Sequence, residues 1–164
     1  MTDKPRPMRV LLATDGSDDA KAAVGWLRHL PLPPEREVMV ITVVSPMLVP
    51  LDPNLLGDLD AAAIAEARRL ADDTAAEVLT GRSATGRVVE GDARDQIVAS
   101  ATDWGADLVV MGARGLGAVK EFFLGSVSLA VARGAPCPVL VCKGEPRGVR
   151  TISVALDGSA DARR

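Results

Sequence analysis

Short apolar runs alternate with amphipathic stretches along most of the chain. The apolar runs have the length of buried strands and lie at 9–14, 37–44, 85–90, 107–111 and 139–142. Apolar residues at helical spacing occupy the stretches between them, at 18–30, 59–79, 92–105 and from 126 to the Pro136-Cys137-Pro138 stop. Strands that alternate with helices form right-handed β-α-β units, so the pattern predicts a parallel α/β sheet covered by helices on both faces.

One connection interrupts this alternation. The segment 45–54 is rich in proline, which predicts a long loop rather than a helix after the second strand. A loop at the carboxyl end of a strand is well placed to cover a ligand, but a variable surface connection explains it equally well.

A glycine-rich segment follows the fourth apolar run. Two residues separate Gly112 from Gly115, and nine more separate Gly115 from Gly125-Ser126 at the predicted start of the last helix. Glycines let a ligand approach the backbone closely, and the first N–H groups of a helix attract negative charge. The spacing G-x2-G-x9-G-S therefore predicts a phosphate site, unless the glycines only permit tight packing of the strand against a helix.

This spacing resembles the nucleotide loop of the ATP-binding universal stress protein family. The resemblance continues through 135–141 and returns in 10–17, so it covers roughly residues 9–143. The chain departs from the common pattern at Leu129 and Gly134, where many members carry an acid and a basic residue. The resemblance implies a doubly wound, five-stranded parallel sheet of the Rossmann-like (flavodoxin-like) type with strand order 3-2-1-4-5.

That strand order locates the expected site. The chain changes direction across the sheet between the first and fourth strands, and such sheets bind ligands at the carboxyl ends of the strands beside that point. By resemblance, the adenine and ribose of ATP are expected against Ala13, Thr14, Asp15, Val43 and Met111. The phosphates are expected at the backbone of Gly112 and Gly115 and at the N–H groups and hydroxyls of Gly125, Ser126, Val127 and Ser128.

The charged residues near the loop have different expected roles. Asp15 would repel phosphate, so we expect it on a ribose hydroxyl or near a Mg²⁺ ion that the ATP phosphates mainly hold. Arg114 and Lys120 could each bind a phosphate or be solvated on the surface, and the sequence leaves both alternatives open.

The composition narrows the class of protein. A chain of 164 residues with 48% hydrophobic content suits one globular domain. Its net charge of −3, with two tryptophans, two phenylalanines and no tyrosine, argues against nucleic acid as a partner. No apolar run reaches the roughly 18 residues of a membrane span, so we expect no membrane association and a cytoplasmic protein. The single histidine, His29, lacks a second candidate base, which excludes a Ser-His-Asp hydrolase.

The sequence near the C-terminus repeats the N-terminus. Residues 150–159 resemble residues 8–17 in the same order, which is the pattern of an internal repeat unless the similarity arises by chance. The predicted parts are an N-terminal tail at 1–7, a universal stress protein domain at 8–143, a linker at 144–149, and the first strand and turn of an incomplete second repeat at 150–164. The chain is then expected to be the first half of a tandem protein.

Two functional classes fit the nucleotide loop. The first is a stress-response regulator whose ATP occupancy changes its shape or its choice of partner, and the second is a slow ATP hydrolase using the same pocket. Fast hydrolysis needs a base that positions water, and the loop offers none, so binding is favoured over catalysis. A dimerisation scaffold without nucleotide is the third alternative. In each case the last strand, at 137–143, should be the edge of the sheet, and the resemblance implies a homodimer in which two such edges pair.

Overall fold

The computed structural model describes residues 6–46, 53–78, 83–116, 124–146, 149 and 151–154. Within these residues, five parallel strands form one sheet in the order β3-β2-β1-β4-β5. The strands are β1 (Met8–Ala13), β2 (Arg36–Val44), β3 (Ser83–Glu90), β4 (Leu108–Gly112) and β5 (Val139–Cys142). The predicted doubly wound sheet with strand order 3-2-1-4-5 is confirmed.

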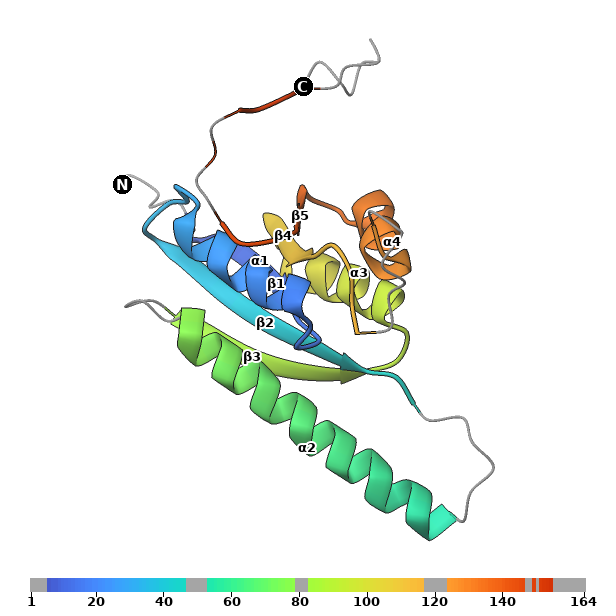
Figure 1. The fold of residues 1–164 in the computed structure, drawn as a ribbon. Helices are drawn as coiled ribbons and strands as arrows, with labels where there is room; N and C mark the ends of the chain where they lie inside the picture. The colour runs from blue at the N-terminus through green and yellow to red at the C-terminus, as the bar shows by residue number, and fades with distance from the viewer. Residues whose placement is uncertain are drawn as a thin grey trace.

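Helices cover both faces of the sheet (Figure 1). They are α1 (Asp18–His29), α2 (Pro53–Val78), α3 (Ala93–Trp104) and α4 (Ser126–Gly134). Alternate residues of β1 enter the two cores that result. Val10 and Leu12 pack with α1 and α2, whereas Leu11 and Ala13 pack with α3 and α4. Each fully buried leucine contributes about 1.5–3 kcal/mol to folding, so the alternation fixes the register of the central strand.

The helix starts follow from local side-chain caps. Ser17 Oγ accepts a hydrogen bond of 3.3 Å from the N–H of Ala20 at the start of α1, and Asp92 Oδ1 accepts one of 2.8 Å from the N–H of Arg94 at the start of α3. Gly105, with φ of 66°, ends α3 in the left-handed conformation that glycine adopts most easily. The N-caps therefore begin α1 and α3 a few residues after the ends of β1 and β3.

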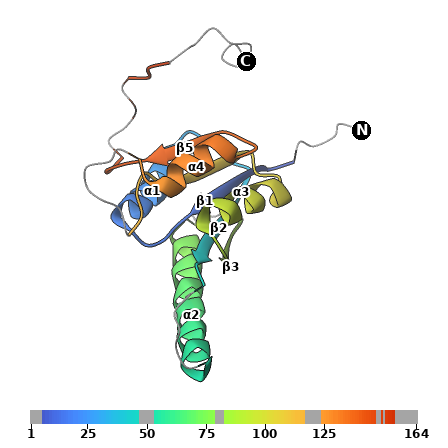
Figure 2. The ribbon, with the colours of Figure 1, turned by 90° about the vertical axis from the view of Figure 1, so that its right-hand side faces the viewer.

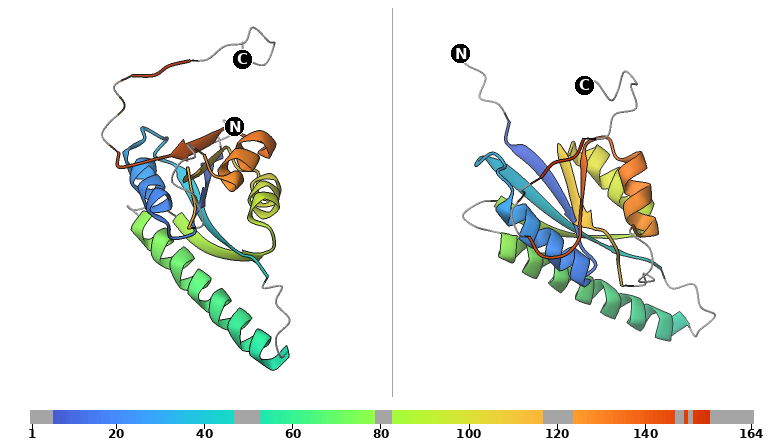
Figure 3. Two further views of the ribbon diagram at one scale, coloured as in Figure 1. Left: turned by 45° about the vertical axis from the view of Figure 1, so that its right-hand side comes forward. Right: turned by 45° about the horizontal axis from the view of Figure 1, so that its top comes forward.

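The second helix differs from the sequence prediction. It begins at Pro53 rather than at Leu59, so the predicted loop 45–54 is wrong at its last two residues, while 47–52 lie outside the described part. A proline is tolerated in the first turn of a helix because the N–H that it lacks would have no partner there. Among the residues of α2 whose burial is described, 57–78, the first buried one is Ala67. The first half of the helix projects beyond the sheet (Figures 2 and 3).

The chain after β5 packs first on α1. Trp26 Nε1 donates a hydrogen bond of 3.0 Å to the carbonyl oxygen of Gly144, and Pro146 lies against Gly25. The first residues of the predicted linker are therefore fixed to the domain. Thr151–Val154 belongs to no helix or strand, and its Ile152 and Val154 are 79% and 73% exposed. The rest of the predicted second repeat lies outside the described residues.

No helix in the described part of the chain has the length and apolar character that a bilayer crossing requires.

Candidate functional site

A cavity of about 710 Å³ lies at the carboxyl ends of β1 and β4. The parallel register brings these strand ends together, because Ala13 pairs with Met111 on one side and with Ile41 of β2 on the other. All eleven residues predicted for the nucleotide site line this strand-end cavity: Ala13, Thr14, Asp15, Val43, Met111, Gly112, Gly115, Gly125, Ser126, Val127 and Ser128.

One wall of the strand-end cavity is apolar. Val43, Met111 and Val127 line it from three different elements, together with Ile41 and Ile97. All five belong to, or pack against, the core between the sheet and the helices α3 and α4. A wall of this kind suits a flat, weakly polar group such as a purine ring.

The N-terminus of α4 forms a second, polar side. Gly125 is its N-cap and supplies no side-chain hydrogen bond, and the first bond of the helix runs from the Leu129 N–H to the Gly125 oxygen at 3.0 Å. Within the described residues, the N–H groups of Ser126, Val127 and Ser128 therefore have no acceptor. The first turn of α4 carries no acidic residue, whereas that of α1 carries Asp18 and Asp19. The positive end of the α4 dipole is thus available to an anion.

The glycines of the loop differ in how closely the rest of the chain approaches them. A Cβ atom on Gly112 would lie 2.6 Å from the backbone of Asp19 and Ala20, and one on Gly115 would lie 2.5 Å from Asp15 Oδ2. A Cβ atom on Gly125 would be 3.2 Å from the carbonyl oxygen of Ala113. At Gly112 the alternative of tight strand-to-helix packing therefore applies. Close approach to a phosphate is not needed to explain Gly112. At Gly115 the Asp15 side chain could shift away from an added Cβ atom, so this contact alone does not require a glycine.

Ser128 holds the loop rather than presenting its hydroxyl to the cavity. It is 2% exposed, and its Oγ donates to the carbonyl oxygen of Ala113 at 2.8 Å or to that of Gly125 at 3.0 Å. The N–H of Gly125 donates to the same Ala113 oxygen at 2.7 Å. The expected contribution of the Ser128 hydroxyl to a ligand is therefore wrong, while Ser126 is exposed at the cavity.

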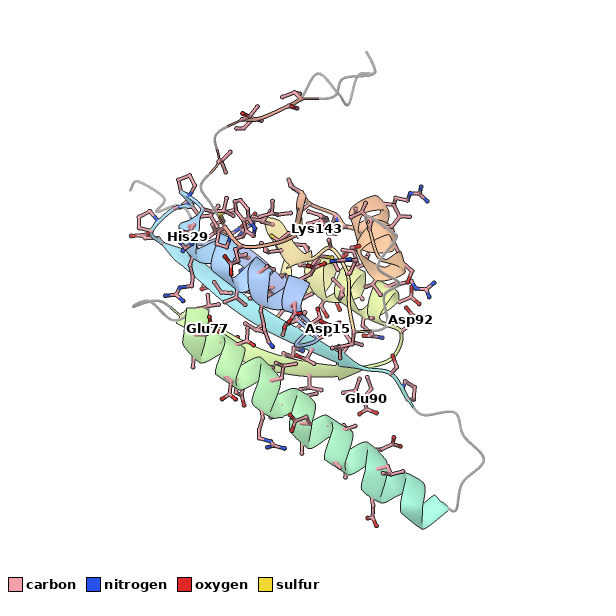
Figure 4. All side chains as sticks on the ribbon, viewed as in Figure 1. Asp15, His29, Glu77, Glu90, Asp92 and Lys143 are labelled. Carbon is pink, nitrogen blue, oxygen red and sulfur yellow. The ribbon has the colours of Figure 1, made fainter. Side chains whose placement is uncertain are left out.

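Asp15 joins the first strand to the loop. Its Oδ1 accepts from the N–H of Ser17 at 3.0 Å, and its Oδ2 accepts from the N–H of Leu116 at 3.0 Å. Figure 4 shows Asp15 and Asp92 toward one end of the sheet and His29 at the other, so His29 is remote from the cavity. Each carboxylate oxygen retains a second lone pair, which leaves Asp15 able to accept from a ribose hydroxyl as well.

The described residues offer little to a metal ion on their own. They contain no group of three or more His, Cys, Asp or Glu side chains that could hold a metal, and Asp15 is the one carboxylate among those that line the cavity. A single carboxylate could bind a Mg²⁺ ion only if most of the ion's oxygen ligands came from elsewhere, such as the phosphates of a nucleotide.

Arg114 is bound to α1. Its Nε donates to Asp19 Oδ2 at 2.9 Å, and this hydrogen bond raises the pKa of the guanidinium above its ordinary value. Its carbonyl oxygen accepts from Ser17 Oγ at 3.1 Å. Arg114 is therefore not simply solvated on the surface, which was one of its two predicted alternatives. Lys120, for which the same alternatives were open, lies outside the described residues. The role of Asp19 was not predicted from the sequence. The acidic pair Asp18-Asp19 after Ser17 was the available signal, but Arg114, the partner of Asp19, is 95 residues away in the chain.

Comparison with known proteins gives one consistent family. The model of the Universal stress protein family matches residues 7–143. A protein of Thermus aquaticus, named universal stress protein in QAH/OAS sulfhydrylase 3′ region, is 36% identical over 138 residues, which cover 82% of this chain and 97% of that protein.

Two solved structures show the same architecture. Hypothetical protein MJ0577 superposes with a TM-score of 0.76 at 26% identity, over 86% of this chain and 99% of its own. A universal stress protein in complex with cAMP superposes with a TM-score of 0.60 at 27% identity, over 85% of this chain and 99% of its own.

Proposed function

The chain belongs to the universal stress protein family, and we propose that it binds ATP in the strand-end cavity. The observation that carries the proposal is the N-terminus of α4. There, three N–H groups with no acceptor in the described residues border the cavity, without a side-chain cap or an acid in the first turn. An anionic group would satisfy them, and phosphate is the anion that the rest of the cavity favours.

The apolar wall supports the assignment of the base. Val43 and Met111 offer apolar surface against which a purine ring could pack. Asp15, just after β1, lines the same cavity and is hydrogen-bonded to the loop at Leu116. In this arrangement the ribose meets Asp15, and the phosphates meet the backbone at Ser126 and Val127. A relative solved with cAMP, which carries adenine, ribose and phosphate, supports the same ligand class.

The chemistry of the site favours a regulator over a fast enzyme. Rapid hydrolysis needs a base that positions water, and Asp15 is the one candidate among the described cavity residues. Both of its oxygens already accept backbone hydrogen bonds, from Ser17 and Leu116, so this carboxylate is engaged in holding the loop. The proposed activity is nucleotide-dependent control of a cytoplasmic stress response, with slow ATP hydrolysis as the alternative.

The proposed assembly is a homodimer through the edge of the sheet. β5 is the last strand in the sheet order, so its outer backbone groups have no strand partner among the described residues. Pairing two β5 edges, within 137–143, across a two-fold axis would satisfy these groups in both copies. We propose that the sequence repeat at 150–164 corresponds to the first strand and turn of a second copy of the domain, which would form as a strand only within a sheet, since 151–154 form none here.

The direct test is the identity and affinity of the ligand. Native mass spectrometry of the freshly purified protein should show one adenine nucleotide per chain, and calorimetry after its removal should show ATP binding with Mg²⁺ present. A protein that carries no nucleotide and gives no heat with ATP, ADP, AMP or cAMP would contradict the proposed function and favour the scaffold.

A further inference from the structure

Resting on the proposed function, we infer that Arg114, held in position by Asp19, contacts the phosphates beyond the first and makes the site prefer nucleotides with more than one phosphate. Arg114 is then a specificity-determining residue, and Asp19 is a positioning residue that does not touch the ligand.

Arg114 is fixed at both its backbone and its side chain. Ser17 Oγ donates to its carbonyl oxygen at 3.1 Å, and its own Nε donates to Asp19 Oδ2 at 2.9 Å. Both partners belong to the turn and first residues of α1, which Gly112 allows to pack directly on the end of β4. The side chain has therefore lost most of its rotamer freedom before a ligand arrives, and a preorganised donor binds more tightly.

The terminal amino groups of Arg114 remain available. A guanidinium has five N–H donors, and the bond to Asp19 uses one of them. In the part of the chain that the structure describes, neither Nη group has an acceptor, and the side chain is 25% exposed. Two parallel N–H groups match two phosphate oxygens, so this side chain suits bidentate contact with a phosphate.

The charges around the cavity indicate which phosphate group of a nucleotide Arg114 would contact. Among the described lining residues, Arg114 is the one basic side chain and Asp15 the one acidic side chain. The N-terminus of α4 is equivalent to roughly half a positive charge, which suits one phosphate group. Further phosphates add negative charge, and Arg114 is the side chain among the described lining residues that can compensate it. The affinity for AMP should therefore depend mainly on the N-terminus of α4, whereas the affinity for ATP should depend on both that N-terminus and Arg114.

Removal of Arg114 also changes the environment of Asp19, its ion-pair partner. The side chain of Asp19 is 11% exposed, and Arg114 is its ion-pair partner. Without the arginine, the carboxylate of Asp19 would lose its ion-pair partner, and its uncompensated negative charge near the cavity would disfavour phosphate. Arg114→Ala alone therefore combines two effects, the loss of donors and the uncovering of a negative charge. The double variant Arg114→Ala with Asp19→Asn separates them, because it removes both charges.

The experiment is calorimetric titration of the full chain with ATP and with AMP, and the readout is the ratio of the two affinities. Arg114→Ala should lower the affinity for ATP by about tenfold to a hundredfold, the usual value of hydrogen bonds to a charged group, and that for AMP by less than about threefold. The double variant should remain weak for ATP. Arg133→Ala, an exposed arginine at the far end of α4, should keep the wild-type ratio.

Two substitutions of Asp19 test its positioning role. Asp19→Asn retains an oxygen that can accept from Arg114 Nε and should keep most of the preference for ATP. Asp19→Ala removes the acceptor for Arg114 Nε, so the arginine side chain can move. This variant should lose much of the preference for ATP over AMP. Near-ultraviolet circular dichroism of Trp26 and Trp104 confirms that each variant is folded.

Three results would overturn the inference while leaving ATP binding intact. They are an equal loss of ATP and AMP affinity in Arg114→Ala, recovery of ATP affinity in the double variant, and a wild-type protein that binds AMP as tightly as ATP. Failure of the wild-type protein to bind any adenine nucleotide would instead overturn the proposed function, and this inference with it.

Discussion

The N–H of Leu116 donates a hydrogen bond of 3.0 Å to Asp15 Oδ2, across 101 residues of sequence. This bond joins the end of the first strand to the loop after the fourth. The absence of a side chain at Gly115 leaves room for it, since a Cβ atom there would lie 2.5 Å from the same oxygen and would displace the carboxylate. The two segments that resemble a nucleotide site in the sequence are thus coupled to each other within the protein, before a ligand is considered.

Removal of the Asp15 carboxylate should loosen that coupling. Asp15→Ala loses the acceptors for the Ser17 and Leu116 N–H groups and should lower the free energy of unfolding by about 1 kcal/mol. Urea denaturation monitored by tryptophan fluorescence gives this value. Asp18→Ala, a neighbouring exposed acid, is the matched control and should change stability less. An equal loss in both variants would show that net charge, rather than these two bonds, is responsible.

The packing of α1 on β4 should make Gly112 intolerant of any side chain. In Gly112→Ala the added Cβ meets the α1 backbone at 2.6 Å, which should cost about 1–3 kcal/mol of stability. Gly57 lies in α2 with no atom within 4 Å of its Cβ position, so Gly57→Ala should instead stabilise by about 0.5–1 kcal/mol. Thermal unfolding of both variants measures the contrast. A stable Gly112→Ala protein would contradict the close approach of α1.

The two thiols should differ in reactivity. Burial raises the pKa of Cys142 to about 11 from a usual value of 9.0, and it also raises the pKa of the less buried Cys137. The folded state therefore favours the neutral Cys142 thiol, which contributes stability below about pH 9 that is lost as the pH rises through 11. A chromogenic disulfide reagent at pH 8 should label Cys137 first and Cys142 only after unfolding. Two equally fast thiols would contradict the burial of Cys142.

The edge strand should determine the oligomeric state. The full chain and a variant that lacks 149–164 should both have twice the chain mass in light scattering at tens of micromolar, roughly the range in which weak assemblies populate. The Trp26–Gly144 bond keeps the chain beyond β5 on α1 in both proteins. A full chain that is strictly monomeric would show that the β5 edge is protected in another way. A dimer lost on truncation would assign the contact to the C-terminal segment.

The strands and the position of the site could be predicted because they depend on local patterns. The apolar runs around Leu11 and Val110 are buried on both faces, and the glycine spacing marks the loop independently of tertiary structure. The strand order itself came from the family resemblance, since local pattern does not say which strands are neighbours.

The features that the sequence did not predict have two causes. Some depend on contacts between distant segments, and one depends on a proline, which can either end a helix or begin one. The start of α2 was missed because proline ends a helix in its interior but fits the first turn, and the segment before Pro53 offered no stronger signal. The Arg114–Asp19 pair and the contact of Gly112 with α1 join segments that the fold alone brings together. For the same reason, the sequence assigned the Ser128 hydroxyl to a ligand, whereas it donates within the loop.

The central claim is that the N–H groups at the start of α4, which have no acceptor among the described residues, bind the phosphate of ATP. Ser126→Glu places a negative charge beside these N–H groups. This charge should stabilise the helix through its dipole but repel phosphate. Ala132→Glu adds the same charge to an exposed position further along α4 and is the control. The decisive measurement is calorimetric titration of both variants with ATP. We predict at least about a tenfold loss of affinity in Ser126→Glu, with an unchanged or higher melting temperature, and wild-type affinity in Ala132→Glu. Wild-type affinity in Ser126→Glu would contradict the claim.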